Sequence, residues 1–508
     1  MAAPESQNDP ESQNEVMAFL TELAGGTPIE THISLVFRGA DCVWKLKKAV
    51  RLSFLDFSDL AAREKFCRRE LALNAPAAPG LYRDVAAIVR RDDGGLALDP
   101  APTGGAEILD WVLRMARVPE GNFLDHIAAR GGLTPALLDA MADNVAAYHQ
   151  ALKPARTGDV GLRRVLAGNR AAALAAGLPS GRVEAWATRV DALLRGLDAW
   201  LVERQGAGFV RRAHGDLHLG NLCLWPSLGD RVQPVPFDAL EFDEDLATID
   251  LAYDLAFLLM DLDQRAGQSA ANRVMNRYVA RTGDAALVRG LPVFMSMRAL
   301  IRAHVRGRSG DRGEADRYLD AAEHYLDPAP VMVVAIGGLP GTGKSTLARV
   351  VAAELGRAPG ALVLRSDEIR KRLHGVAPET RLPDAAYAET MSARVFALLA
   401  DTTRDAAAAG QCVIADATFL DPSHRAMIRA AAAPGRFVGI WLTAPITELE
   451  RRILARRDDA SDATVTVLHA TAARGDTVPK GWTIIDASDP EIARERLYKA
   501  LRNPDLPC

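Results

Sequence analysis

The stretch Gly338-Leu339-Pro340-Gly341-Thr342-Gly343-Lys344-Ser345 follows the pattern GxxxxGK[ST] and decides the fold of the C-terminal part. A continuous apolar run at 331–336 precedes it, as expected for a buried parallel strand, and a helical run at 346–355 follows it. In this context the glycines let backbone N–H groups surround phosphates, and the helix directs its positive end at them. The residues expected to bind ATP are Gly338, Gly341, Thr342, Gly343, Lys344, Ser345 and Thr346.

The sequence around this loop predicts a parallel α/β sheet. Asp327-Pro328-Ala329-Pro330 forms a stiff, helix-breaking linker before it. Beyond the loop, apolar strands alternate with Ala- and Arg-rich helical stretches, an alternation typical of parallel sheets. Lys344 can reach the β- and γ-phosphates, and the Ser345 hydroxyl can bind Mg²⁺. The later strands are expected at 362–364, 413–415, 438–442 and 483–485.

The second strand of this part leads into Ser366-Asp367-Glu368-Ile369-Arg370. Ligands of parallel α/β sheets bind beyond the carboxyl ends of the strands, so Asp367 is expected to face the γ-phosphate region. There its carboxylate can accept a proton from an attacking hydroxyl, and Arg370 can hold an anionic substrate. The alternative is that Asp367 only caps the helix that follows it.

The third strand ends in Val413-Ile414-Ala415-Asp416, an apolar run closed by an aspartate. As the third element after a phosphate-binding loop, Asp416 is expected to hold Mg²⁺ directly or through water. Further along, one short helical stretch is expected to close over the phosphates as a lid, with an exposed basic helix face as the alternative. Its arginines are Arg451, Arg452, Arg456 and Arg457.

Residues 331 to 508 resemble P-loop kinases of the polynucleotide-kinase, gluconate-kinase and zeta-toxin type. The shared features are GLPGTGKST, then SDEIRK, then a strand ending in DAT. The resemblance implies that Asp367 is the general base for a hydroxyl substrate, with Arg370 and Arg425 near it. The acceptors of this group range from sugars to nucleic-acid ends to nucleotide sugars, so the motifs leave the acceptor open.

A second constellation lies in the N-terminal part, at His214-Gly215-Asp216-Leu217-His218-Leu219-Gly220-Asn221, followed by Asp238. Phosphoryl transfer in kinase-like folds requires this spacing. One Asp accepts the substrate proton, while the Asn and a later Asp bind the Mg²⁺ ions that bridge the ATP phosphates. Two alternatives are a metal site formed by His214 and His218 and a structural loop with incidental acids.

This part resembles the aminoglycoside and choline phosphotransferases, relatives of the protein kinases, on HGDLHLGN, FDALEFD and DLAYDLAFL. The resemblance implies that Asp216 is the catalytic base and that Asn221 and Asp238 are the Mg²⁺ ligands. His214 and Asp254 would support the loop. It also places Lys45 where the family has the lysine that pairs with ATP phosphates, with Glu70 as its partner; Lys47 is a rival for that role. No GxGxxG motif precedes Lys45, so the sequence does not identify a glycine-rich loop over the ATP phosphates at this site.

The expected fold class is multidomain α/β, in which a bilobal protein-kinase-like α+β domain precedes a P-loop three-layer α/β domain with a parallel sheet. Residues 1–14 carry a polar duplication of PESQN and predict a disordered tail. The kinase-like domain is expected at 15–328, with a small lobe at about 15–105 and a helical lobe at about 106–328. The P-loop domain is expected at 329–508. This fusion looks like a bacterial family labelled bifunctional aminoglycoside phosphotransferase/ATP-binding protein. The label describes similarity of fold and does not establish that the substrate is an antibiotic.

Composition narrows the function classes. The 508 residues include 61 Lys and Arg against 65 Asp and Glu, so no bulk positive charge attracts nucleic acid. The five cysteines stand far apart without a CxxC pair, which indicates a reducing compartment. With no long apolar run and no signal pattern, we expect a cytoplasmic protein that does not bind membranes.

The sequence therefore favours a kinase that uses ATP and Mg²⁺ at two sites to phosphorylate hydroxyls of small molecules. Two alternatives remain open. The C-terminal part could be a kinase for RNA or DNA ends, or the chain could be a nucleotide-binding regulatory or stress protein with little turnover. The acceptor at each site, the oligomeric state and any order between the two reactions stay open.

Overall fold

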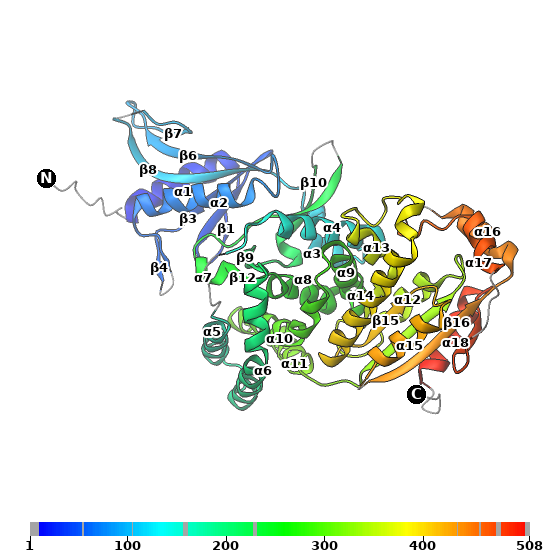
Figure 1. Cartoon of the computed structure of the whole chain (residues 1–508). Helices are drawn as coiled ribbons and strands as arrows, with labels where there is room; N and C mark the ends of the chain where they lie inside the picture. The colour runs from blue at the N-terminus through cyan, green and yellow to red at the C-terminus, as the bar shows by residue number, and fades with distance from the viewer. Residues whose placement is uncertain are drawn as a thin grey trace. The chain divides into compact units, whose positions relative to one another are not determined.

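The computed structural model describes residues 10–52, 55–103, 105–155, 161–226, 231–433, 435–456, 459–473 and 479–502 (Figure 1). The chain forms two compact units. The first combines the chain up to Leu133 with Ala147–Val165 and Ala199–Asp254, and the second combines Thr134–Ala146, Leu166–Asp198 and Leu255–Cys508. The predicted boundary near residue 328 lies between α11 (Arg312–His324) and β13 (Met332–Gly338), and the second unit includes helices from both sides of it.

The first unit contains an antiparallel sheet with the strand order β1-β2-β3-β8-β6-β7. Side chains alternate along β6, and the two faces pack on different helices. Val85 and Val89 pack in a cluster with Cys67 of α2, while Ile88 packs in a cluster with Val16 of α1. The elements are α1 (Pro10–Ala24), β1 (Ile29–Glu30), β2 (Ser34–Arg38), β3 (Cys42–Lys47), α2 (Leu60–Asn74), β6 (Tyr82–Arg90), β7 (Leu96–Asp99) and β8 (Glu107–Ala116).

The prediction of a disordered tail over residues 1–14 is wrong from Pro10 onward, because α1 begins there. Residues 1–9 lie outside the described residues. Gln13 links the helix to the sheet region. Its Nε2 donates to Lys47 O (3.2 Å) and to Asp110 Oδ2 (3.0 Å), and its Oε1 accepts from Ala49 N–H (2.8 Å). A polar segment is therefore ordered by partners far away in the sequence.

Short ladders and turns complete the first unit and carry the HGD segment. β9 (Val210–Arg212) pairs antiparallel with β12 (Thr248–Asp250), and β10 (Leu222–Pro226) pairs antiparallel with β11 (Val232–Pro236). The HGD segment follows β9 directly and leads through η2 (Leu219–Asn221) into β10. The other short elements are β4 (Arg51–Leu52), β5 (Leu55–Asp56), η1 (Glu120–Asn122), α3 (Leu124–Ala129) and α7 (Glu244–Ala247).

Helices make up the middle of the chain, as the Ala- and Leu-rich sequence predicts. In the second unit, Trp186 of α6 donates its indole N–H to Ser296 Oγ of α10 at 2.8 Å, so these two helices pack directly. The helices are α4 (Pro135–Ala151), α5 (Leu162–Ala175), α6 (Ser180–Gly206), α8 (Leu251–Ala266), α9 (Gln268–Thr282), η3 (Ala285–Arg289), α10 (Leu291–Arg308) and α11.

The C-terminal part of the second unit is built on a five-stranded parallel sheet with the order β14-β15-β13-β16-β17. The predicted fold class is confirmed, and all four later strands lie where the apolar runs predict them. The strands are β13, β14 (Leu362–Arg365), β15 (Val413–Asp416), β16 (Arg436–Thr443) and β17 (Thr483–Asp486). The helices between and after them are α12 (Lys344–Ala352), α13 (Ser366–Leu373), η4 (Asp384–Tyr387), α14 (Glu389–Ala408), α15 (Pro422–Ala431), α16 (Ile446–Ala455), α17 (Val465–Ala472) and α18 (Pro490–Arg502).

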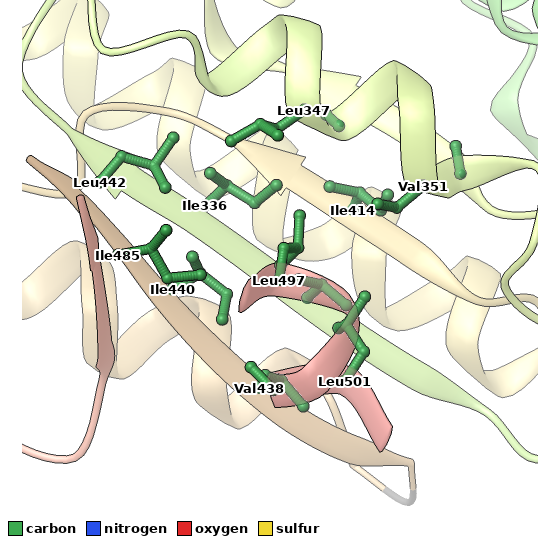
Figure 2. Close-up of a cluster of buried hydrophobic side chains, with 14 of the residues drawn as sticks. Ile336, Leu347, Val351, Ile414, Val438, Ile440, Leu442, Ile485, Leu497 and Leu501 are labelled. Carbon is green, nitrogen blue, oxygen red and sulfur yellow. The ribbon is translucent and has the colours of Figure 1, made fainter. Parts of the chain in front are cut away.

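One face of this sheet packs on α12 and α18, and Figure 2 shows the side chains that meet there. Ile336 and Ile440 from the strands contact the cluster formed by Leu347 of α12 and Leu497 of α18, and all four are nearly or fully buried. Burial of these apolar side chains holds α12 in place, and α12 begins at Lys344. Among the described residues, no helix is both long enough and apolar enough to cross a membrane.

Candidate active sites

Two lysines of β3 meet one buried glutamate of α2 in the first unit. Lys45 and Lys47 lie two residues apart on a strand, so their side chains point to the same face. Their Nζ atoms donate to Glu70 Oε1 and Oε2, each at 2.8 Å. Lys47 also pairs with Glu241 and is 0% exposed, whereas Lys45 is 13% exposed and reaches Asp238 Oδ1 at 2.5 Å. The geometry favours Lys45 over Lys47 as the phosphate-facing lysine.

The charges of this cluster are set by burial and by the lysines. Burial opposes ionisation of Glu70, but Lys45 and Lys47 outweigh it and lower the pKa of Glu70 to about 2. Burial raises the pKa of Glu241, which Lys47 offsets in part. Sequence reasoning assigned no role to Glu241, although it lies in the quoted segment FDALEFD.

The HGD loop is held by a buried aspartate of α8. Asp254 accepts hydrogen bonds from the backbone N–H of His214 (3.1 Å) and of Gly215 (2.9 Å), and from His149 Nε2 of α4 (3.1 Å). Gly215 has φ +83°, a left-handed conformation that suits glycine, and a Cβ there would lie 3.1 Å from Leu240 Cβ. These contacts agree with a supporting role for Asp254. The sequence did not identify His149 as a partner of Asp254, because His149 belongs to none of the motifs and lies in an ordinary helical stretch.

His214 is a neutral loop support in this structure. Its Nε2 donates to Phe237 O (2.9 Å), and its Nδ1 accepts from the backbone N–H of Asp216 (3.3 Å). Burial lowers the pKa of His214, which favours this uncharged form. The ring of His218 instead accepts from Gly220 N–H (3.1 Å), so the two histidines bind different partners. In the part of the chain that the structure describes, no group of three or more His, Cys, Asp or Glu side chains could hold a metal ion.

Asn221 and Asp238 present oxygen atoms that fit Mg²⁺, and Asp216 lies beside Asn221. Asn221 Nδ2 donates to Asp216 Oδ2 and to Asp216 O, both at 2.9 Å, so the amide oxygen remains as the ligand atom. The side chains of Asp216 and Asp238 are 43% and 41% exposed, which leaves room for phosphates and water. Asp238 has φ 61°, and its N–H donates to Tyr82 Oη (2.9 Å). Amide and carboxylate oxygens completed by water and phosphate are the donor set that Mg²⁺ prefers.

In the second unit the P-loop has the backbone geometry of a phosphate cradle. Gly338, Gly341 and Gly343 have φ values of +133°, +87° and +90°. A Cβ on Gly338 would lie 2.4 Å from Leu442 O, so only glycine fits there. The Lys344 ammonium donates to the carbonyls of Gly338 (3.0 Å) and Leu339 (2.9 Å), inside the loop that would receive the phosphates.

Ser345 and Asp416 lie in contact at the carboxyl edge of the sheet. Ser345 Oγ donates to Asp416 Oδ2 at 2.5 Å, and Arg365 Nε lies 3.3 Å from the same oxygen. A hydroxyl and a carboxylate in this position fit Mg²⁺ bound beside ATP phosphates. Thr346, the next predicted ATP-binding residue, lines the same cavity and is exposed.

Asp367 lies in the first turn of α13 and lines this cavity. The alternative that it caps the helix is wrong, because α13 begins at Ser366 and its N-cap residue is Arg365. Burial raises the pKa of Asp367, with a further contribution from Asp416, and the positive charges of Arg365 and Lys344 offset this in part. A carboxylate with a raised pKa suits proton transfer near neutral pH.

Four of the six arginines predicted at the substrate or in the lid line the cavity: Arg370, Arg451, Arg452 and Arg456. Arg370 is 6% exposed and donates to Ala386 O (2.9 Å) and Ser392 Oγ (3.3 Å). Arg452 donates to Glu448 Oε1 at 2.6 Å. Arg456 Nη1 lies 3.5 Å from Ser461 O. Arg457 lies outside the described residues.

Arg425, another of the predicted arginines, does not line the cavity. Its guanidinium donates to the carbonyls of Phe419 (2.7 Å) and Leu420 (2.8 Å). Phe419 has φ 49°, so Arg425 stabilises a tight turn after β15. Its position follows from these local carbonyls, which the resemblance could not reveal.

The cavity has a volume of about 1050 Å³ and includes aromatic side chains that sequence reasoning missed. The rings of Phe396 and His424 stack with their centroids 3.6 Å apart and an interplanar angle of 7°. Arg370 lies over the ring of Tyr387 at 4.7 Å. Aromatic residues at these positions carry no motif, so only the folded chain shows that they meet.

Comparison with known proteins finds both a family match in the C-terminal part and a relative along most of the chain. An AAA domain family matches residues 333–476. The uncharacterized protein Rv2004c of Mycobacterium tuberculosis is 30% identical over 497 residues, covering 93% of this chain and 95% of its own. The resemblance that the motifs indicated is confirmed. These findings support a kinase-type enzyme that uses a nucleotide.

Solved structures match each part of the chain. A choline/ethanolamine kinase family protein from Mesorhizobium loti is 15% identical, with a TM-score of 0.35, and the match covers 62% of this chain and 95% of that one. A gluconokinase from Sinorhizobium meliloti is 23% identical, with a TM-score of 0.25, and the match covers 35% of this chain and 94% of that one.

Replacing the two β3 lysines separates their roles. Lys47→Met leaves Glu241 without its cation in a buried position, and we expect it to lower the free energy of unfolding by roughly 3 kcal/mol. Lys45→Met leaves Glu70 paired with Lys47 and is expected to cost about 1 kcal/mol. Urea unfolding of both variants, followed by intrinsic fluorescence, measures the difference. Equal losses would contradict the assignment of Lys47 as the structural lysine.

Proposed function

Because this chain belongs to the family of the Mycobacterium tuberculosis protein Rv2004c along nearly its whole length, we propose one function for both of its parts. It is an ATP- and Mg²⁺-dependent phosphotransferase with two kinase sites that phosphorylate hydroxyl groups of small molecules. The observation that carries the proposal is the presence, at each site, of a carboxylate base beside oxygen ligands for Mg²⁺ and a phosphate-facing lysine.

At the first site, Asp216 accepts the proton of the acceptor hydroxyl. The hydrogen bond from Asn221 Nδ2 orients the Asp216 carboxylate. Asn221 and Asp238 hold Mg²⁺, which when bound neutralises charge on the ATP phosphates. Lys45 reaches the phosphates from β3, and Glu70 keeps it in place.

At the second site, Asp367 is the base and the P-loop backbone binds the phosphates. Lys344 donates hydrogen bonds inside the loop and is placed to pair with the β- and γ-phosphates. Ser345 and Asp416 hold Mg²⁺. Arg452 and Arg456, on and after α16, contribute positive charge from the lid side of the cavity.

The acceptor of the second site carries an anionic group that Arg370 binds. Arg370 is almost fully buried in the cavity wall, and among the described residues no carboxylate forms an ion pair with it. Its Nε, which is buried, has no hydrogen-bond partner there. The negative charge of Asp367 acts on Arg370 without forming an ion pair, and an anionic acceptor would supply a direct partner for the buried guanidinium.

Product formation tests the function directly. The purified chain is incubated with Mg-ATP and a bacterial metabolite extract, and mass spectrometry detects compounds that gain one phosphate. Asp216→Asn is expected to lower the amount of product from the first site at least about 100-fold. Lys344→Ala is expected to lower the amount of product from the second site to the same extent. Asp320→Asn, which changes an exposed aspartate of α11, serves as the control. ATP binding without any product would favour a nucleotide-binding regulatory protein instead.

The raised pKa of Asp367 predicts a pH dependence for the second site. Asp367 must be ionised to accept a proton. The reaction rate is therefore at its maximum above the pKa of Asp367 and falls about tenfold per pH unit below that pKa. Because burial raises that pKa, the loss begins at a higher pH than the value of about 4 for an ordinary aspartate. Initial rates measured with the Asp216→Asn chain between about pH 4 and pH 9 check this. A rate that stays constant down to about pH 4 would contradict the assignment.

A further inference from the structure

Helix α9 is bonded to the edge strand of the P-loop sheet, within the second compact unit. β14 is the outermost strand, so one side of its backbone has no neighbouring strand. Two asparagines of α9 supply the missing partners. Asn276 Oδ1 accepts from Val363 N–H (2.7 Å), and the Nδ2 atoms of Asn272 and Asn276 donate to Ala361 O (3.0 and 3.2 Å). Helix α9 therefore holds the strand that leads to the base Asp367.

A charge network ties α9 to the segment that follows α13. Arg277 Nη2 donates to Glu379 Oε1 (2.7 Å), and Arg281 Nη1 donates to Glu379 Oε2 (2.8 Å). Both arginines also bind Asp143 of α4 at 2.6–2.8 Å. The four side chains are 20–31% exposed, so water screens these interactions only in part. The network fixes Glu379 by three charge-assisted hydrogen bonds, one from Arg277 and two from Arg281.

Glu379 lies beside residues that form the cavity wall. Arg381 and Leu382 line the cavity, and Leu382 N–H donates to Asp462 Oδ2 at 2.9 Å. The buried Lys371 of α13 binds Asp462 Oδ2 (2.5 Å) and the carbonyl of Thr380. Residues 374–383 are therefore held both at the cavity, through Lys371 and Asp462, and at Glu379.

We propose that Glu379 is a positioning residue of the P-loop site, through which α4 and α9 anchor the acceptor wall formed by Arg381 and Leu382. The proposal rests on the proposed function of that site. Lys344 and Ser345 belong to another element, so nucleotide binding does not depend on the network. Loss of the Glu379 charge releases the segment and weakens acceptor binding.

Glu379→Gln tests the proposal in the full chain that also carries Asp216→Asn, which silences the first site. It removes the charge and keeps the size of the side chain. Glu323→Gln is the matched control: Glu323 forms a comparable, partly exposed pair with Arg182 (2.9 and 2.6 Å) in the same unit and does not line the cavity. Glu379→Asp, which keeps the charge, is the conservative variant.

Three measurements are made on each chain. Amide hydrogen exchange over residues 374–387 is expected to speed up about tenfold in Glu379→Gln. Affinity for a non-hydrolysable ATP analogue with Mg²⁺ is expected to stay within about twofold. Phosphorylated product is followed in a dilution series of the metabolite extract. It is expected to fall about tenfold in dilute extract and to recover to within about twofold in concentrated extract, as a loss of acceptor affinity requires. Glu379→Asp is expected to restore about half of the loss.

Several results would overturn the proposal. Unchanged exchange in Glu379→Gln, or equal effects in Glu323→Gln, would show that Glu379 does not anchor the segment. Faster amide exchange in Glu379→Gln with an unchanged product yield across the dilution series would show that the network only supports the structure. Weaker binding of the ATP analogue would show the same. If the Asp216→Asn chain forms no product at all, the proposed function of the P-loop site fails, and the role of Glu379 fails with it.

Discussion

Parallel pairing of β13, β14 and β15 is the constraint on which the P-loop site depends. In the register of these strands, both Ile336 and Arg365 lie opposite Asp416; β14 and β15 end at this level, and β13 continues two residues further to Gly338. The residues that continue each strand are therefore brought to one edge of the sheet. The hydrogen bond between Ser345 and Asp416, 71 residues apart, follows from that register and from α12, which the buried cluster in Figure 2 holds against the sheet.

The first unit reaches a comparable arrangement with buried carboxylates. Asp254 accepts hydrogen bonds from the backbone N–H groups of His214 and Gly215, and Glu70 accepts them from the two lysines of β3. A buried carboxylate is stable only when it is paired and hydrogen-bonded. Each of these two acids therefore fixes the position of the groups around it, while the side chains of Asp216 and Lys45 stay 43% and 13% exposed.

Motif spacing and apolar runs predicted the features that local sequence controls. The strands of the parallel sheet were predictable because buried parallel strands read as continuous apolar segments, and the P-loop glycines because few other residues adopt their conformations. Lys45 and Lys47 could not be separated, since a strand places residues i and i+2 on the same face. Their different partners, Asp238 for Lys45 and Glu241 for Lys47, are brought to them only by the folded chain. Gln13 looked like part of a disordered tail because its partner Asp110 lies 97 residues away. Arg425 was expected near Asp367 but does not line the cavity, because its guanidinium donates to the carbonyls of Phe419 and Leu420.

The central claim is that one chain carries two separate nucleotide sites. The most direct test is calorimetric titration of the full chain with a non-hydrolysable ATP analogue and Mg²⁺, which counts the bound nucleotides. We expect two nucleotides per chain. Lys344→Ala should leave one, and adding Lys45→Met should leave none. A single nucleotide per chain that Lys344→Ala alone abolishes would contradict the account, because the first site would then bind no ATP.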